Sequence, residues 1–280
     1  MATFDFILKE TFMKRKHIFL LLLLLITIAL IACLTQKETA IQQTKVTTTE
    51  LPTSISGIEI PLEKSDLQIV EHPGFTLVYS EEHEQAAWVA YELTAEEVAG
   101  TVSRTDRFLE DPAITTGSAT DSDYKGSGYD RGHLAPAADM KWSEEAMNAS
   151  FYFSNMSPQV PAFNRGIWKR AEEQVRDWAT QYGGVYIATG PVLNDILTKT
   201  GRNQVSVPAF YYKTVMDKKM TKIITLLIPN KGSKADLQTF CISTDSLEKI
   251  TGIDFFPKLT DSTENRLESE NIPERWSWSN

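Results

Sequence analysis

The chain has 280 residues, of which 42% are hydrophobic and 23% are charged, so it can bury the core of one large or two small domains and is neither disordered nor collagen-like. The net charge of −9 argues against binding nucleic acid through bulk positive charge, so any phosphate-binding site must be local. Two cysteines, Cys33 and Cys241, are too few for a disulfide framework or a cysteine zinc site, so a bound metal would use oxygen and nitrogen ligands.

The first 33 residues are predicted to be a secretory signal peptide. A basic cluster at residues 13–17 precedes an apolar run over residues 18–32, which is short for a membrane span. The run ends in Leu30-Ile31-Ala32-Cys33, which resembles a lipobox. We therefore expect export and a lipid anchor on Cys33 in the bacterial cell envelope, with a secreted protein or a single-span anchor as alternatives.

The rest of the chain divides by composition. Residues 34–57 are rich in Thr, Gln, Lys and Glu, which predicts a flexible tether. Residues 58–260 are predicted to form one domain. Residues 261–280 form a charged C-terminal tail with two tryptophans, and its packing is left open.

Strands and helices alternate irregularly within the domain, which predicts an α+β fold. Two β-rich runs, 75–80 and 86–93, are separated by a polar turn and predict a hairpin. Further strands are expected over residues 184–189, 205–216 and 222–228. Because no strand-helix-strand unit repeats, we expect an antiparallel or mixed sheet flanked by helices. Cys241 lies in a strand-like stretch and is expected to be a buried, unreactive thiol.

The strongest helix is predicted from Asn164 to Tyr182, where apolar residues recur at helical spacing. Asn164 lies in line with the apolar stripe and Glu172 lies at its edge. Polar groups on the packed side of a helix need partners, which suggests a role in a site. The simpler interpretation is that Asn164 caps the helix and that Glu172 is an ordinary flanking charge.

Residues suited to binding phosphate and accepting a proton lie next to one another at Arg131, Gly132 and His133. A guanidinium group can hold two phosphate oxygens, and glycine lets the backbone approach closely. An imidazole can accept a proton near neutral pH, with a pKa of about 6.5 before local effects. Neighbouring positive charge would lower this pKa, whereas a carboxylate that accepts the other ring N–H would raise it. Alone, this tripeptide is a weak signal, because most single histidines are structural.

A longer set of motifs resembles the DNA/RNA non-specific endonuclease family. The resemblance covers most of residues 70–256 and is carried by Asp130–His133, Ala137–Met140, Phe153–Gln159, the spacing Asn164, Trp168 and Glu172, and flanking segments at 88–91, 111–112, 186–191 and 207–208. It implies a ββα-metal core within a larger α+β domain.

The resemblance also implies roles for individual residues. His133 would be the general base, Asn164 the sole direct protein ligand of Mg²⁺, and Glu172 the residue that orders water on the metal. Arg131 would support the phosphate, and Asp130 of the same motif is placed with the substrate-binding residues. A further family arginine matches either of two candidates, Arg104 and Arg107. Asp139 and Met140 depart from the animal members, which bears on the subfamily.

We therefore expect an exported, metal-dependent endonuclease that hydrolyses DNA and RNA with little base specificity. The expected cofactor is Mg²⁺, with Mn²⁺ as an alternative. The expected partners are the nucleic-acid backbone and the membrane, and a homodimer is considered. The alternatives are a lipoprotein that binds nucleic acid without cutting it and an adhesion lipoprotein.

Overall fold

The computed structural model describes residues 55–62, 67–194 and 197–279, which belong to one compact unit over Leu51–Asn280. The predicted signal peptide, Cys33 and most of the predicted tether lie outside the described residues. Among the described residues, no helix is long and apolar enough to cross a membrane.

The core of this unit is a seven-stranded sheet in which every neighbouring pair is antiparallel. The hairpin predicted from residues 75–80 and 86–93 is confirmed, and the strands expected near residues 216 and 222 also pair as an antiparallel hairpin. In spatial order the strands are β1 (Gln68–His72), β2 (Phe75–Ser80), β3 (Gln85–Thr94), β6 (Gly184–Pro191), β9 (Phe210–Asp217), β10 (Ile223–Pro229) and β11 (Cys241–Ile242).

The predicted strand over 205–216 is two strands. β8 (Val205–Val207) pairs with β7 (Thr198–Thr200) in a separate small sheet, and β9 begins only at Phe210. Pro208 lies between them and has no N–H to donate to a strand ladder, which explains the break.

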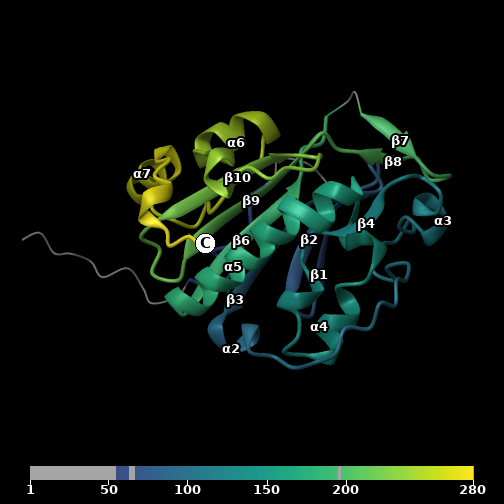
Figure 1. The fold of residues 1–280 in the computed structure, drawn as a ribbon, viewed down its shortest axis with the longest axis horizontal. Coiled ribbons are helices and arrows are strands. Elements are labelled where there is room, and N and C mark those ends of the chain that lie inside the picture. Colours follow the sequence, from purple (N-terminus) through teal and green to yellow (C-terminus); the bar gives the residue numbers. More distant parts are fainter. Residues whose placement is uncertain (1–54, 63–66, 195–196, 280) are drawn as a thin grey trace, which may run out of the picture. The chain divides into compact units, whose positions relative to one another are not determined.

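The two faces of the large sheet are covered by different helices (Figure 1). Along β6, Val185 and Ile187 pack with α5 (Lys169–Tyr182), whereas Tyr186 and Ala188 pack in the cluster that contains α6 (Thr244–Thr251) and α7 (Asp261–Ser269). This alternation follows from the two-residue period of a strand. The shorter helices are α2 (Ala95–Val98), α3 (Asp121–Tyr124) and α4 (Glu144–Ala149), with 3-10 turns η1 (Ala137–Asp139), η2 (Phe153–Asn155), η4 (Leu237–Phe240) and η5 (Pro273–Arg275).

A smaller ββα unit carries the motif residues. β4 (Asp130–His133) pairs antiparallel with β5 (Met156–Gln159), and the chain then enters a π-helical turn, η3 (Phe163–Trp168), that leads into α5. The α+β fold class is therefore confirmed. The single helix predicted from Asn164 is wrong in its first turn, because Gly166 has a non-helical backbone (φ −115°, ψ −106°).

The C-terminal segment packs onto the domain. Trp276 is buried, with its ring centroid 4.6 Å from that of Trp178 in α5, and Trp178 Nε1 donates to the Ser277 carbonyl at 2.5 Å. Cys241 is half-buried rather than fully buried, and burial raises the pKa of its thiol to about 12, as expected of an unreactive cysteine.

Candidate active site

Four of the predicted site residues line one pocket of about 470 Å³: Arg104, Asp130, Arg131 and Asn164. The pocket lies where β4, the turn η3, helix α3 and the loop around residue 106 meet. The four predicted residues thus converge on one hollow from three chain segments, and they bring to it two cations, one carboxylate and one amide.

His133 ends β4 and is enclosed by aromatic rings. Its ring centroid lies 4.9 Å from that of Phe151 and 5.9 Å from that of Phe108, both in edge-on contact. Its backbone carbonyl accepts a hydrogen bond from Trp168 Nε1 at 3.3 Å. The buried Nε2 atom has no hydrogen-bond partner among the described residues, so this nitrogen is not committed to another protein group.

The environment keeps His133 uncharged. Burial lowers the pKa of its imidazole to about 3, and the positive charges of Arg104 and Arg131 act in the same direction while Asp106 opposes them. Of the two directions left open by the sequence, the structure favours the lower pKa, with burial as the main cause. A neutral imidazole at physiological pH can accept a proton without first losing one.

Two of the arginines that line the pocket, Arg104 and Arg131, are held by aromatic rings and by exposed carboxylates. Arg131 lies over the Phe108 ring at 4.0 Å and donates to Asp121 at 2.5 Å. Arg104 lies over the Phe151 ring at 4.8 Å and is paired with Asp106. Exposed ion pairs of this kind contribute little to stability, so a phosphate could replace either carboxylate at small cost.

The structure distinguishes the two arginine candidates. Arg104 lines the pocket and contributes to the pKa of His133. Arg107 is exposed, and no contact within the described ranges joins it to the pocket. Arg104 is therefore the better match to the family arginine.

Asn164 is oriented by Asp130. The Asn164 Nδ2 group donates to Asp130 Oδ2 at 2.9 Å, and Arg165 donates twice to the same carboxylate, at 2.6 and 2.8 Å. Because a carboxylate only accepts, the amide nitrogen must face Asp130, and the amide oxygen is left to act as a ligand. The cap position of this helix is Ala162, so the capping interpretation of Asn164 is wrong.

Asp130, expected to bind substrate, makes its observed contacts with protein groups. Burial raises the pKa of its carboxyl, but hydrogen bonds from Arg165 and Asn164 outweigh this effect and lower the pKa below its ordinary value. An ionised Asp130 would repel a phosphate. Its position is that of a residue that orients Asn164.

Glu172 belongs to a buried group of charges on α5 and the central sheet. Burial raises the pKa of its carboxyl to about 7, Lys213 opposes this shift and Asp139 adds to it. The surrounding polar contacts are Lys213 Nζ to the Leu134 carbonyl at 3.3 Å and to Thr189 Oγ1 at 3.2 Å, Arg176 to Asp139 at 2.8 Å, and Tyr91 to Asp139 at 2.7 Å. This environment is not that of an ordinary flanking charge.

The sequence analysis missed Lys213, which is only 1% exposed. Its Nζ lies 4.4 Å from the centre of the Trp168 ring, and burial lowers its pKa to about 8 while Glu172 and Asp139 oppose that shift. The strand period carried a signal, because Lys213 shares a sheet face with the core residues Tyr211 and Val215. The aromatic partners Phe108 and Phe151 had no local signal.

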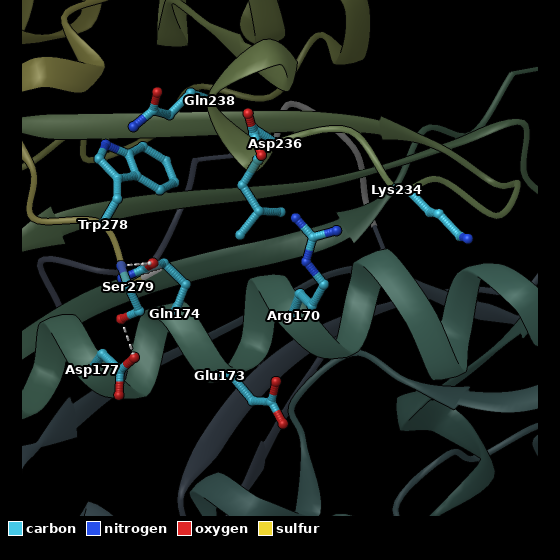
Figure 2. A pocket seen from close by; sticks show the side chains of 10 residues that line it. Arg170, Glu173, Gln174, Asp177, Lys234, Asp236, Gln238, Trp278 and Ser279 are labelled. Carbon is cyan, nitrogen blue, oxygen red and sulfur yellow. Dashed lines mark hydrogen bonds between the residues drawn. The ribbon is translucent and has the colours of Figure 1, made fainter.

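A second cavity, of about 800 Å³, lies away from these residues (Figure 2). It is formed by the exposed face of α5, the turn at η4 and the C-terminal segment. Arg170, Lys234 and Trp278 are among its lining residues, and none of the predicted site residues is. Its lining residues differ from those of the pocket that holds Arg104, Asp130, Arg131 and Asn164, which sets it apart from the candidate active site.

The fold and the residues gathered at β4, η3 and α5 define a ββα-metal nuclease. A profile of the DNA/RNA non-specific endonuclease family matches residues 58–262. Human mitochondrial endonuclease G is 32% identical over 212 residues, covering 69% of this chain and 70% of that protein. A nuclease from Nostoc is 34% identical over 210 residues, covering 70% and 76%.

A solved structure agrees with these sequence matches. The crystal structure of the EndoG/EndoGI complex, which concerns the mechanism of EndoG inhibition, superposes with a TM-score of 0.65 at 29% identity. The match covers 70% of this chain and 88% of that one. The chain belongs to the DNA/RNA non-specific endonuclease family.

Proposed function

We propose that this protein is a divalent-metal-dependent endonuclease that hydrolyses phosphodiester bonds of DNA and RNA, with Mg²⁺ as its ion and Mn²⁺ as a substitute. The observation that carries the proposal is the pairing of a neutral His133 with an Asn164 whose amide oxygen is left available by Asp130. If His133 were only structural and Asn164 only capped a helix, neither a neutral imidazole nor an oriented amide would be required.

The residues fit a divalent metal. Asn164 would hold the ion through its amide oxygen, and Glu172, eight residues further along on α5, would order water on the ion. Mg²⁺ prefers oxygen ligands and retains most of its waters, so a site with few protein ligands is chemically reasonable. When bound, the ion would supply positive charge against the phosphate and the leaving oxygen.

The chain's own residues provide the remaining chemistry. His133 Nε2 would accept a proton from the attacking water, because it is neutral and has no competing hydrogen bond. Arg131 and Arg104 would hold the phosphate by exchanging their exposed carboxylate partners for its oxygens. These contacts are to the backbone, so little base specificity is expected.

Cleavage of plasmid DNA and of an RNA transcript, with Mg²⁺, with Mn²⁺ and with a chelator, tests the proposal. We expect activity with either ion on both substrates and none with the chelator. His133→Ala should lower cleavage by about 100-fold to 10,000-fold and still bind DNA in Ca²⁺. A folded His133→Ala variant with full activity would refute the mechanism, and a wild-type protein that binds without cutting would support the silent alternative.

We also propose that the protein is exported and anchored by lipid on Cys33. The support is the order of basic cluster, apolar run and lipobox in the sequence. Cys33→Ser should move the protein from the membrane fraction to the soluble fraction or block its processing. An unmodified Cys33, found by mass spectrometry of the membrane-bound wild type, would contradict the proposal.

A further inference from the structure

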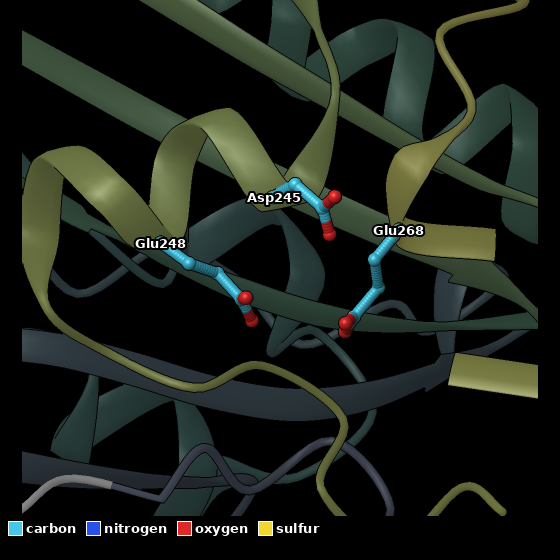
Figure 3. A group of neighbouring side chains, drawn as sticks. All are labelled: Asp245, Glu248 and Glu268. Carbon is cyan, nitrogen blue, oxygen red and sulfur yellow. The ribbon is translucent and has the colours of Figure 1, made fainter. Parts of the chain in front are cut away.

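Helices α6 and α7 bring three carboxylates together on the side of the sheet that lies opposite α5. Asp245 and Glu248 come from α6 and Glu268 comes from α7, and their side chains point toward one another (Figure 3). One oxygen from each lies within 4.8 Å of the others. The three residues are named the acidic triad.

The positions of the triad follow from the two helices. Asp245 and Glu248 are three residues apart and therefore share a helix face. Leu247 and Leu267 are fully buried in the core cluster beneath the sheet and fix both helices against it. The three carboxylates are thus held close together by packing that does not depend on them.

Glu268 gives the triad a buried carboxylate oxygen without a hydrogen-bond partner. Its side chain is 4% exposed, and its buried Oε1 atom has no hydrogen bond. Within the described part of the chain, no ion pair involves a triad residue, and the one polar contact found is a hydrogen bond from the Phe255 N–H to Glu248 at 2.9 Å. A buried carboxylate without a compensating group is strongly unfavourable.

We propose that the acidic triad binds a Ca²⁺ ion that joins α6 to α7. Calcium–oxygen distances are about 2.3–2.6 Å, so two ligands of one ion can be separated by up to roughly 5 Å, and the triad oxygens lie within this limit. Mg²⁺, with ligands at about 2.1 Å, would need a more compact set. Glu248 and Asp245 are partly exposed, so water can complete the coordination.

A proton is the competing occupant. Burial raises the pKa of Glu268 to about 9, and Glu248, Glu264, Asp254 and Asp245 all add to the shift. Without a cation, Glu268 would therefore carry a proton at neutral pH. The two occupants can be distinguished with Glu268→Gln, in which the side chain is neutral and of the same size. If a cation is bound, this variant loses its stabilisation by the cation; if a proton is bound, its stability is unchanged or higher.

The test is the melting temperature of the full chain at pH 7.5, measured in a chelator and in increasing Ca²⁺. Calcium should raise the Tm of the wild type by on the order of 5 °C, because it binds the folded state. Glu268→Gln and Glu248→Gln should each abolish the rise. The matched control is Asp261→Asn, which removes an exposed carboxylate from α7, the helix that carries Glu268. This control should retain the calcium-dependent rise in Tm.

Two further measurements separate this site from the candidate active site. Asn164→Ala should retain the calcium-dependent rise in Tm, and equilibrium dialysis with radioactive calcium should show one bound ion fewer in Glu268→Gln than in the wild type. The proposal is overturned if Glu268→Gln keeps the full calcium response or if Asn164→Ala alone loses it. A Glu268→Gln variant that is unchanged or more stable in chelator, in a protein whose wild type ignores Ca²⁺, would show that the triad holds a proton instead.

Discussion

The charge of His133 is set by the rings and cations around it. Its pKa of about 3 lies below that of an unfolded histidine, about 6.5, so between these values the unfolded chain binds a proton that the folded chain does not. The contribution of His133 to the free energy of unfolding is therefore largest above pH 6.5 and is lost as the pH falls toward 3.

We expect this difference to make stability depend on pH. Lowering the pH from 7 to about 4.5 should cost about 3 kcal/mol of the free energy of unfolding through His133 alone. His133→Phe retains an aromatic ring beside Phe108 and Phe151 but cannot titrate, so its stability should fall less steeply over the same range. Urea unfolding in a chelator, at several pH values, measures both slopes. Equal slopes would show that His133 is accessible to protons in the folded state.

Asp130 controls which end of the Asn164 amide faces the pocket. Replacing it with Asn introduces a donor, so the lock on the Asn164 orientation is lost. We expect Asp130→Asn to raise the Mg²⁺ concentration needed for half-maximal cleavage by about 10-fold to 100-fold, with little change in Tm. The control is Arg165→Gln, which removes the exposed partner of the same carboxylate and should change the Mg²⁺ dependence much less. Unchanged Mg²⁺ dependence in Asp130→Asn would rule out this positioning role.

At the scale of elements, β4 and β5 approach each other closely because Gly132 has no side chain. A Cβ atom added at Gly132 would lie 2.1 Å from the side chain of Gln159. Gln159 is fully buried, so it has little room to move. The glycine between Arg131 and His133 is thus required by packing within the ββα unit.

Gly132→Ala should therefore lower the stability of the domain. Overpacking of this kind costs about 1–3 kcal/mol, and Gln159→Ala should recover part of that cost by removing the clashing atoms. Chemical unfolding of the two single variants and the double variant gives the coupling between the sites. An additive double variant would mean that β4 and β5 separate rather than clash.

The elements differed in how well the sequence could predict them. Strands of the large sheet were predictable, because they are short runs rich in aromatic and β-branched residues, such as Val185, Tyr186 and Ile187 in β6. The turn η3 was not, because the apolar residues on either side of Gly166 keep helical spacing while its backbone departs from it. The break between β8 and β9 was also missed. It falls at Pro208, which lies within a stretch rich in β-branched and aromatic residues that was predicted as one strand.

At the scale of the whole molecule, the local part of the candidate site could be predicted and the part that depends on tertiary contacts could not. Motif spacing could indicate that Arg131, His133 and Asn164 lie near one another, because they belong to β4 and η3, which are neighbouring elements. Lys213 reaches the same region from β9, 79 residues after the Leu134 carbonyl that it contacts. No local pattern records such a contact, since it depends on how the central sheet brings β9 beside α5.

The C-terminal segment also makes tertiary contacts with α5 that no local sequence pattern predicts. Trp276 is 3% exposed and contacts Trp178 and Tyr182, both on α5, and Lys222 lies 4.6 Å from its ring. The helix that carries Glu172 is therefore packed between the sheet and residues near the C-terminus.

Trp276→Ala should destabilise the whole domain, because removing a buried indole costs about 3–5 kcal/mol. For a domain of this size, that corresponds to a fall in Tm of roughly 10 °C, measured by calorimetry. Trp142→Ala is the matched control, because Trp142 is 40% exposed and should lose far less. Cleavage well below the lower Tm should be largely retained, since Trp276 touches no residue of the pocket. A Trp276→Ala variant as stable as the Trp142→Ala control would show that the C-terminal segment unfolds independently of α5.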